Sequence, residues 1–343
     1  MPLSSPVMTD IGLKRPRASR RRRRRDKALL FDIHSLSTHD GPGLRTVFFF
    51  KGCSLKCEWC QNPESIGLKN QVWHNPVHCL GCGICMEVCP LDAVHPHPER
   101  NIAIDYDVCT SCGLCTTTCP GQALKMLAQS YTLDDLLYIV RRDKPFFTKK
   151  VGGGVTVSGG EALLQADFVT ELFKGCQTMG VHTAIDTCGQ VPWESIEQVL
   201  PYTNLFLYDL KLIDREAHKH FTGTDNRTIL SNLLRLSAAI RRDYPETRIW
   251  IRTPLIPGAT LSEGNLADIG EFLDDMLPDM IERWELCSFN PLPDEKYDRL
   301  SLTWKYKGIP MMTQDEGELA LSWARSHFSA PEKVIRTGLT AKA

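Results

Sequence analysis

Two runs of four cysteines constrain what this chain can fold into more than any other feature of its sequence. The pattern C-x2-C-x2-C-x3-C-P begins at Cys79 and returns thirty residues later at Cys109. In this spacing three thiolates of a run hold one [4Fe–4S] cluster and the fourth holds the other, whereas zinc sites usually pair two short C-x2-C hairpins. The sequence thus predicts two clusters, one on Cys79, Cys82, Cys85 and Cys119 and the other on Cys109, Cys112, Cys115 and Cys89.

A third group of cysteines, Cys53, Cys57 and Cys60, has the spacing C-x3-C-x2-C and follows the apolar stretch Thr46–Lys51. The group supplies three ligands, and a cubane cluster has four irons, so one iron stays open for a chelating substrate. By itself such a loop also resembles a zinc loop. Its place directly after a predicted strand favours a third [4Fe–4S] cluster.

The sequence contains fourteen cysteines but no apolar signal-peptide core and no run of eighteen apolar residues. So many cysteines in a chain without a leader indicate metal ligation rather than disulfides, and no helix is expected to span a membrane. We therefore expect a cytoplasmic protein without a membrane partner. Outside the three groups, Cys176, Cys188 and Cys287 are interpreted as small core residues.

The first 27 residues carry ten basic and two acidic side chains, a net charge of +8. Because the whole chain has a net charge of −1, the remainder carries −9. A block of arginines cannot bury apolar surface, so we expect a disordered basic tail; an arm for an anionic partner is the alternative. The acidic body makes nucleic acid a poor partner, and none is expected.

Strand and helix patterns alternate from Tyr131 onward, and Thr46–Lys51 adds an earlier strand. Repeated βα units predict a parallel sheet with right-handed crossovers. Six units are too few for an eight-stranded barrel, so the expected fold class is α/β, an open partial (β/α)6 barrel. The six predicted strands are Thr46–Lys51, Gly154–Ser158, Val181–Thr187, Asn204–Leu210, Thr247–Thr253 and Trp284–Asn290.

The stretch from Gln61 to about Ala128 is rich in Cys, Gly and Pro and has little apolar periodicity. Such a segment needs metal rather than an apolar core to hold it together, so we interpret it as an insert that binds the two four-cysteine clusters. The predicted division is a tail (1–27), the first part of the core with the cysteine loop (28–60), the insert (61–128), the rest of the core (129–300) and a C-terminal helix and tail (301–343).

Several motifs resemble those of the radical S-adenosylmethionine superfamily and, within it, of the glycyl-radical-enzyme activating enzymes. The resemblance covers roughly residues 29–300, and a ferredoxin-like insert is typical of the longer members. The motifs are Asp40-Gly41-Pro42-Gly43-Leu44-Arg45, Gly52-Cys53 through Cys60-Gln61-Asn62-Pro63-Glu64, Gly152-Gly153-Gly154-Val155-Thr156, Ser158-Gly159-Gly160-Glu161, Asp186-Thr187-Cys188-Gly189 and Asp209-Leu210-Lys211.

This resemblance implies a reaction and its participants. One electron from a reduced cluster cleaves S-adenosylmethionine into methionine and a 5′-deoxyadenosyl radical, which takes a hydrogen atom from one glycine Cα of a partner glycyl radical enzyme. A reduced flavodoxin or ferredoxin is the expected electron donor. The protein needs no acid or base of its own, because the cofactor carries the chemistry. Members with such an insert serve lyases, dehydratases, decarboxylases and succinate-adding enzymes, and the sequence does not choose among them.

Residue chemistry indicates how the ligand would be held. Gly159 and Gly160 lack a Cβ, so their carbonyls can approach the ligand's ammonium closely, and Glu161 opens a helix, where a carboxylate is favoured. Trp59 either shields the cluster or leans on the adenine ring. The residues expected to contact S-adenosylmethionine are Trp59, Gln61, Gly159, Gly160, Glu161, Asp186, Thr187, Asp209, Leu210, Lys211, Arg252 and Asn290.

Charge balance adds a further expectation. Asp186 and Asp209 end neighbouring predicted strands, and the ligand's own carboxylate should lie near them. Three carboxylates in a partly buried pocket cannot all stay ionised without a cation. Lys211 supplies one cation, and the oxygens of Thr187 would help to hold a monovalent metal ion as a second.

Two residues in the predicted site have open roles. Arg252 could hold the ligand's carboxylate, the partner's backbone or the fold itself. The related enzymes often carry a histidine where Asn290 ends the last predicted strand. An amide there can hydrogen-bond a ribose hydroxyl but cannot carry a charge.

Two other functions are weighed against activation of a glycyl radical enzyme. The chain could be another radical S-adenosylmethionine enzyme that acts on a small molecule or peptide, or it could be an electron-transfer protein, a two-cluster ferredoxin on a carrier domain. The Cys53 group argues against a carrier, which needs no open iron. An assay of S-adenosylmethionine cleavage separates the carrier from both enzymes.

The ligand count yields a testable number. Eleven cysteines provide three, four and four ligand positions, so anaerobic reconstitution should give about twelve irons and twelve sulfides per chain. Saturation near about eight irons, with Cys53, Cys57 and Cys60 free to react with an alkylating reagent, would contradict the radical-enzyme assignment.

Overall fold

The computed structural model describes residues 27–147 and 152–341. The predicted basic tail lies outside the described residues, apart from Lys27, which begins the first strand. Within the two described ranges, no helix has the length and apolar character needed to cross a membrane.

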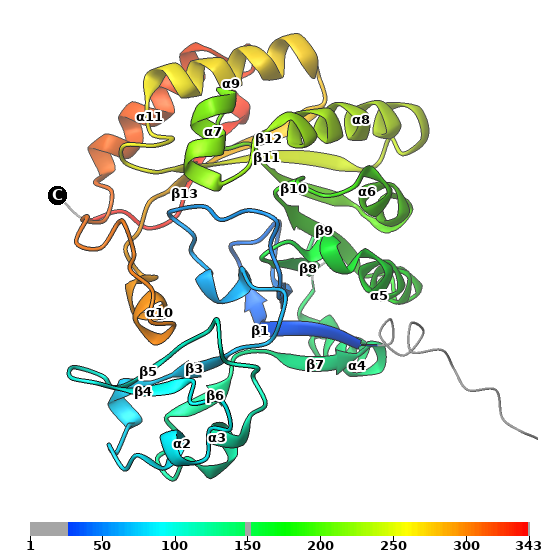
Figure 1. Ribbon diagram of the computed structural model, residues 1–343. Coiled ribbons are helices and arrows are strands. Elements are labelled where there is room, and N and C mark those ends of the chain that lie inside the picture. Colours follow the sequence, from blue (N-terminus) through cyan, green and yellow to red (C-terminus); the bar gives the residue numbers. More distant parts are fainter. Residues whose placement is uncertain (1–26, 148–151, 342–343) are drawn as a thin grey trace, which may run out of the picture.

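A nine-stranded, mostly parallel sheet forms the centre of the molecule (Figure 1). Seven consecutive strands, from β2 to β13 in space, run parallel, and two antiparallel strands extend the β2 edge. In spatial order the strands are β13 (Val334–Thr337), β12 (Ile281–Ser288), β11 (Arg248–Leu255), β10 (Leu205–Asp209), β9 (His182–Thr187), β8 (Gly154–Gly159), β2 (Arg45–Phe50), β1 (Lys27–Ser37) and β7 (Gln129–Thr132).

All six strands predicted from the sequence are present, with small differences at their ends. Their sequences are largely apolar because parallel strands are covered on both faces. In β2, for example, all six residues are buried. The last predicted strand is wrong at its end, since β12 stops at Ser288 and Asn290 lies two residues beyond it. The strands β1, β7 and β13 were not predicted. Most residues of β1 are partly or fully exposed, and β7 and β13 are edge strands of only four residues each.

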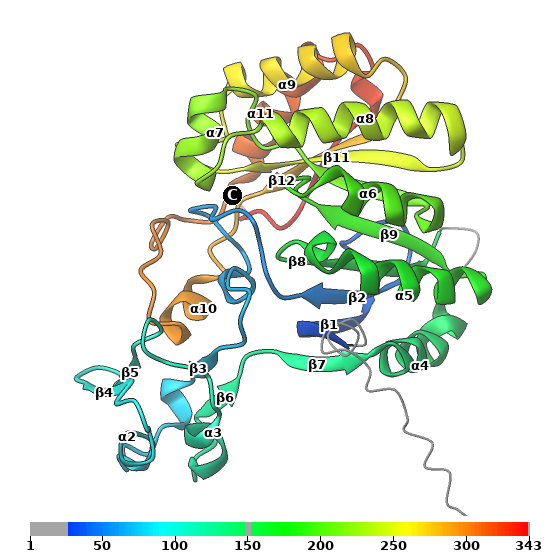
Figure 2. The same ribbon diagram turned by 45° about the vertical axis from the view of Figure 1, so that its right-hand side comes forward.

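Helices follow most of the parallel strands and cover the sheet (Figure 2). Several begin with side-chain caps that the sequence encodes locally: Thr132 and Asp135 form a reciprocal capping box, as do Thr313 and Glu316. The helices are α4 (Leu133–Asp143), α5 (Ala166–Thr178), α6 (Trp193–Val199), α7 (Arg215–Thr222), α8 (Arg227–Asp243), α9 (Glu263–Met276), α10 (Asp294–Arg299) and α11 (Gln314–Ser326).

The predicted insert lies at one end of the molecule, away from α8 and α9 (Figures 1 and 2). It has two antiparallel sheets of two strands each and two short helices: β3 (Val72–His74) with β6 (Leu124–Met126), β4 (Val94–His97) with β5 (Asn101–Ile104), α2 (Ile84–Glu87) and α3 (Leu114–Thr118). Contrary to the expectation of no apolar core, it has a small one, in which Val72, Val94, Ile102, Ile104 and Leu124 pack around Cys85 and Cys115.

Arg45, the last residue of the Asp40–Arg45 motif, is wholly buried and ties the loop before β2 to β8. Its guanidinium donates to the carbonyl of Pro42 in that loop at 3.1 Å, to Thr156 Oγ1 at 2.6 Å, and to the carbonyls of Gly152 and Val155 at 2.7 and 2.6 Å. Burial lowers the pKa of Arg45 to about 9. This motif residue therefore shapes the loop rather than facing a ligand.

Candidate active site

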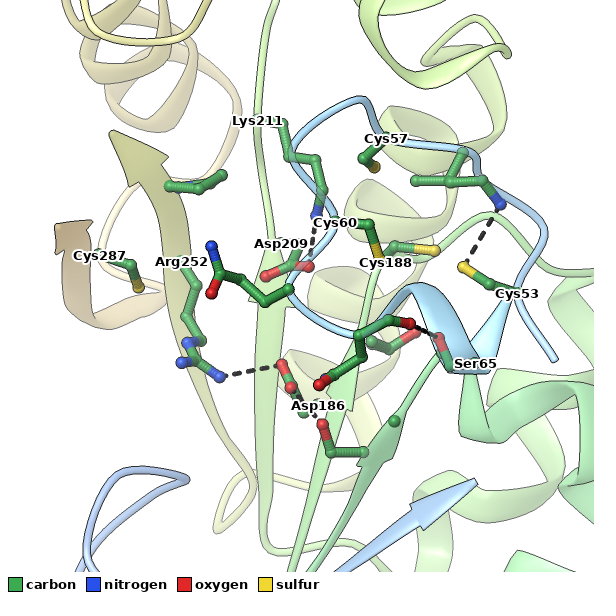
Figure 3. Close-up of a pocket in the computed structure, with 18 of the residues that line it drawn as sticks. Cys53, Cys57, Cys60, Ser65, Asp186, Cys188, Asp209, Lys211, Arg252 and Cys287 are labelled. Atoms are coloured by element: carbon green, nitrogen blue, oxygen red, sulfur yellow. Dashed lines mark hydrogen bonds and ion pairs between the residues drawn. The ribbon is translucent and has the colours of Figure 1, made fainter. Parts of the chain in front are cut away.

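A cavity of about 330 Å³ lies where the parallel strands β8 to β11 end, and the loop that carries Cys53, Cys57 and Cys60 covers it (Figure 3). Carboxyl ends of parallel strands are the usual place for active residues in such folds. Besides the three cysteines, nine of the predicted contact residues line this cavity: Trp59, Gln61, Gly159, Gly160, Asp186, Thr187, Asp209, Lys211 and Arg252.

The cysteine loop is fixed to the turn that follows it. The Gly52 N–H donates to the carbonyl of Ser65 at 2.7 Å, and the Cys53 N–H donates to that of Ile66 at 3.3 Å. Burial raises the pKa of Cys57 to about 12. A metal that binds here must therefore displace a proton from the thiol.

Gly159 and Gly160 line the cavity, and they also touch the start of the cysteine loop. The Gly160 N–H donates to the carbonyl of Phe50 at 2.9 Å, and the next N–H, of Glu161, donates to the carbonyl of Gly52 at 2.7 Å. The end of β8 thus carries the base of the cysteine loop as well as forming a wall of the cavity.

Glu161 is fully buried, and its carboxylate points into the protein. Four donors surround it: Leu163 N at 3.0 Å from one oxygen, and Thr187 Oγ1, Cys188 N and Cys188 Sγ at 2.8, 2.9 and 3.1 Å from the other. Burial raises the pKa of Glu161, while these donors favour the ionised form. Its predicted contact with S-adenosylmethionine remains a prediction; in the structure it joins the strand ends.

The charged side chains of the cavity are already paired. Lys211 Nζ forms an ion pair with Asp209 Oδ2, Arg252 Nη1 lies 3.2 Å from Asp186 Oδ1, and Arg252 Nε lies 3.7 Å from Glu285 Oε2. Burial raises the pKa of Asp209, and the Lys211 charge opposes this. Burial, the largest single influence, would lower the pKa of Lys211, but the Asp209 carboxylate together with the nearby Cys57 and Cys188 outweighs it, and the pKa lies above its usual value.

The other predicted contact residues take different positions. The Leu210 side chain is buried, and its N–H donates to the carbonyl of Arg252 at 2.9 Å. Asn290 lines an adjoining cavity of about 360 Å³, and its Oδ1 accepts from Leu292 N at 3.2 Å. Trp59 is buried in an aromatic cluster, with Phe221 at 6.0 Å between ring centres, while also lining the first cavity.

Two of the three cysteines interpreted as core residues also line the cavity. Cys176 and Cys188 both belong to the main hydrophobic core, as expected, whereas Cys287 is half-buried, and Cys188 and Cys287 line the candidate site. Cys188 lies beside Cys53 (Figure 3), and the neighbouring Cys188 thiol lowers the pKa of Cys53. The sequence could have predicted the position of Cys188 at the cavity, because this residue directly follows the strand-end motif residues Asp186 and Thr187.

Ser158 and Glu285 complete the polar network, although neither was predicted to have a role of its own. Ser158 Oγ donates to Asp186 Oδ2 at 2.7 Å, on the side of that carboxylate away from Arg252. Glu285 is buried in β12 and faces Arg252 from the neighbouring strand. Its position within a strand, two residues before Cys287, gave no motif signal.

In the insert, each of two separate cavities is lined by four cysteines, three from one run and one from the other. Among the described residues, no three Cys, His, Asp or Glu side chains converge as tightly as the ligands of a single metal ion; the thiolates of a cubane bind different irons and surround a larger space. One cavity has Cys79, Cys82, Cys85 and Cys119, and the other has Cys89, Cys109, Cys112 and Cys115.

Comparison with known proteins gives the family. Residues 47–269 match the radical SAM superfamily. The chain is 38% identical over 285 residues to the (2S)-3-sulfopropanediol dehydratase activating enzyme of Klebsiella oxytoca, covering 82% of this chain and 88% of that one. It is 36% identical over 313 residues to the choline trimethylamine-lyase activating enzyme of Oleidesulfovibrio alaskensis, covering 90% and 98%. The chain belongs to the radical SAM superfamily.

Its relatives also give its place within the superfamily. It is an activating enzyme of the kind that serves glycyl radical enzymes, as the Cys53 group and the strand-end motifs predicted. This decides against the electron-carrier alternative. The solved structure of Streptococcus suis SuiB bound to its precursor peptide SuiA has a TM-score of 0.51 at 12% identity, over 85% of this chain and 48% of that one, and shares the fold alone.

The surroundings of Glu161 predict the effect of replacing it. In Glu161→Gln, the amide NH2 would face donors where the carboxylate accepts, so we expect a lower melting temperature and a free energy of unfolding reduced by about 1–3 kcal/mol. The control is Glu171→Gln, which changes an exposed carboxylate paired with Lys174. An unchanged melting temperature with lost S-adenosylmethionine binding would instead support the direct ligand contact predicted from the sequence.

Proposed function

We propose that this activating enzyme holds a [4Fe–4S] cluster on Cys53, Cys57 and Cys60 and binds S-adenosylmethionine at the iron left open. When bound, the cluster supplies the electron that cleaves S-adenosylmethionine to methionine and a 5′-deoxyadenosyl radical. The product radical takes a hydrogen atom from a glycine Cα of a partner enzyme, which then carries the glycyl radical.

The observation that carries this proposal is the position of three thiols over the strand ends, on the cavity that Gly159 and Gly160 also line. Three thiolates are the smallest set that leaves one iron of a cubane without a protein ligand. A fourth thiol, that of Cys188, lies nearby but is engaged by the carboxylate of Glu161. The ligand set therefore fits a cluster with one open iron.

We also propose the type of barrel and the nature of the insert. The parallel strands β2 to β12 with their helices form an open, partial (β/α)6 barrel, into which residues 61–128 insert a ferredoxin-like domain with two [4Fe–4S] clusters. The two four-cysteine cavities support this assignment, because each takes its fourth cysteine from the other run, as the spacing predicts. The enzyme would then hold three clusters in all.

The polar side chains of the cavity would orient the ligand. Asp186, Thr187 and Asp209 offer oxygens from adjacent strand ends, suited to the ligand's amino group or to a monovalent cation. Lys211 and Arg252 are paired with the two carboxylates, which keeps the pocket's charge balanced before the ligand's carboxylate arrives.

The second cavity shares Trp59, Gln61, Arg252 and Cys287 with the first, and it opens beside the strand ends β11 and β12. We assign it to the glycine-bearing segment of the partner, which must reach the ligand's ribose carbon. Relatives named for dehydratases, lyases and decarboxylases leave the partner's reaction open. A reduced flavodoxin or ferredoxin in the cytoplasm is the proposed electron donor.

The proposal is tested by Cys57→Ala. Removing one of three ligands should destabilise the whole cubane, so S-adenosylmethionine cleavage should fall below detection while the insert still binds about eight irons. Electron paramagnetic resonance on a candidate partner, incubated with S-adenosylmethionine and reductant, should show a glycyl radical with the unaltered enzyme only. Cys176→Ala, which changes a buried core cysteine, is the control. Retained cleavage in Cys57→Ala would contradict the proposed ligand set.

We propose two alternative roles for the insert. It either relays electrons to the radical site, or it stabilises the fold and helps the partner to dock. The double variant Cys82→Ala with Cys112→Ala removes one ligand from each four-cysteine cavity, and both residues are exposed. Relay predicts that dithionite restores glycyl radical formation while reduced ferredoxin or flavodoxin does not. Equal activity with both donors would rule out relay, and failure with both would indicate a role in stability or docking.

A further inference from the structure

The short helix α10 follows β12 and lies between the cysteine loop and the insert (Figures 1 and 2). Its six residues belong to none of the motifs that identify the family, and none of them lines the cavity. The helix nevertheless contacts the last cysteine of the loop and the residues that follow it.

Lys296 of α10 uses all three of its ammonium donors on one turn of the chain. Its Nζ lies 2.7 Å from Glu64 Oε1, 2.8 Å from Asn62 Oδ1 and 3.2 Å from the carbonyl oxygen of Gln61. An ammonium group has three N–H donors, so none is left over. The Glu64 side chain is only 7% exposed, so its carboxylate is buried, whereas the Lys296 side chain is 35% exposed.

The turn that Lys296 holds also holds the first cysteine. The carbonyls of Ser65 and Ile66 accept from Gly52 N and Cys53 N, so the turn after Cys60 is joined by hydrogen bonds to the chain before Cys57. A shift of this turn would move both ends of the cysteine loop.

Tyr297, the next residue of α10, contacts the last cysteine directly. Its hydroxyl donates to the carbonyl of Cys60 at 3.1 Å. The Tyr297 ring stacks on Trp304, with 5.5 Å between centres and 23° between planes, and Trp59 belongs to the same buried aromatic cluster. This packing fixes the hydroxyl's direction.

Two further residues of the helix, Asp298 and Arg299, contact the insert. Arg100 donates to the carbonyl of Asp298 at 2.8 Å, and the Arg299 guanidinium lies 5.1 Å from the ring centre of Trp73. Leu300, just after the helix, packs with apolar residues at the base of the insert. The position of α10 is therefore set by the insert as well as by the core.

We propose that Lys296 and Tyr297 are positioning residues for the cysteine loop: α10 acts as a clamp that holds Cys53 and Cys60 at the spacing a [4Fe–4S] cluster requires. The inference rests on the cluster proposed above for this loop. Partners that orient metal ligands in this way commonly change metal affinity about 10- to 100-fold when removed.

The test uses variants that avoid an unpaired buried charge. Lys296→Met alone would leave Glu64 buried without its cation, so the primary variant combines Lys296→Met with Glu64→Met. Tyr297→Phe keeps the stacked ring and removes only the hydroxyl. Lys307→Met is the matched control, because Lys307 pairs with Asp294 and Asp298 on the same helix but does not touch the cysteine loop.

The readout is iron release to a chelator from the reconstituted, full-length enzyme, followed with and without S-adenosylmethionine. S-adenosylmethionine should slow one kinetic phase of iron release, and that phase is assigned to the cluster with the open iron. We expect that phase to be about 10- to 100-fold faster in the double variant, measurably faster in Tyr297→Phe and unchanged in Lys307→Met, with insert iron released at the same rate in all.

Each other outcome has a clear meaning. If the protected phase has the same rate in the double variant as in the unaltered enzyme, the clamp is wrong while the proposed function stands. If Lys307→Met accelerates it equally, the effect belongs to the helix's general stability and the clamp is again wrong. If the unaltered enzyme shows no phase protected by S-adenosylmethionine, the proposed function fails and the clamp with it.

Discussion

The cysteine loop can lie over the strand ends because Gly159, the last residue of β8, and Gly160 after it have no side chains. A Cβ on Gly160 would stand 2.2 Å from the carbonyl oxygen of Gly52, and one on Gly159 would stand 2.3 Å from that of Phe50. Both obstacles are backbone atoms, which cannot move aside as a side chain can, and Gly159 also has a φ of +117°. The glycines thus permit the contact that places three thiols above the cavity. We expected them to serve the ligand, and the structure adds this second requirement.

The polar groups of the cavity hold one another in place. Ion pairs and hydrogen bonds fix Asp186 between Ser158 and Arg252, and Asp209 against Lys211. Groups held in this way need little rearrangement when the ligand arrives, which is the main contribution a protein makes when a cofactor carries the chemistry. Glu161 does not line the cavity but lies buried behind its wall, where it joins the ends of β8 and β9.

The sequence predicted the parts of this molecule that depend on local pattern. Apolar runs and glycines located the six central strands, and the cysteine spacing gave groups that the structure brings together in three places. It could not predict side-chain direction, which depends on contacts between distant segments. The inward orientation of Glu161 depends on Thr187 and Cys188, 26 and 27 residues away. The clamp of Lys296 on Glu64 joins residues more than two hundred positions apart, and no periodicity signals it.

The central claim is that three cysteines leave one iron open and that S-adenosylmethionine binds it through its amino nitrogen and carboxylate oxygen. Electron–nuclear double resonance on the reduced enzyme tests this directly, using ligand labelled with a magnetic isotope at the amino nitrogen or at the carboxylate oxygen. The account predicts hyperfine coupling of both labels to the cluster, and loss of both couplings in Cys57→Ala. An enzyme that cleaves S-adenosylmethionine while showing coupling from neither label would contradict it.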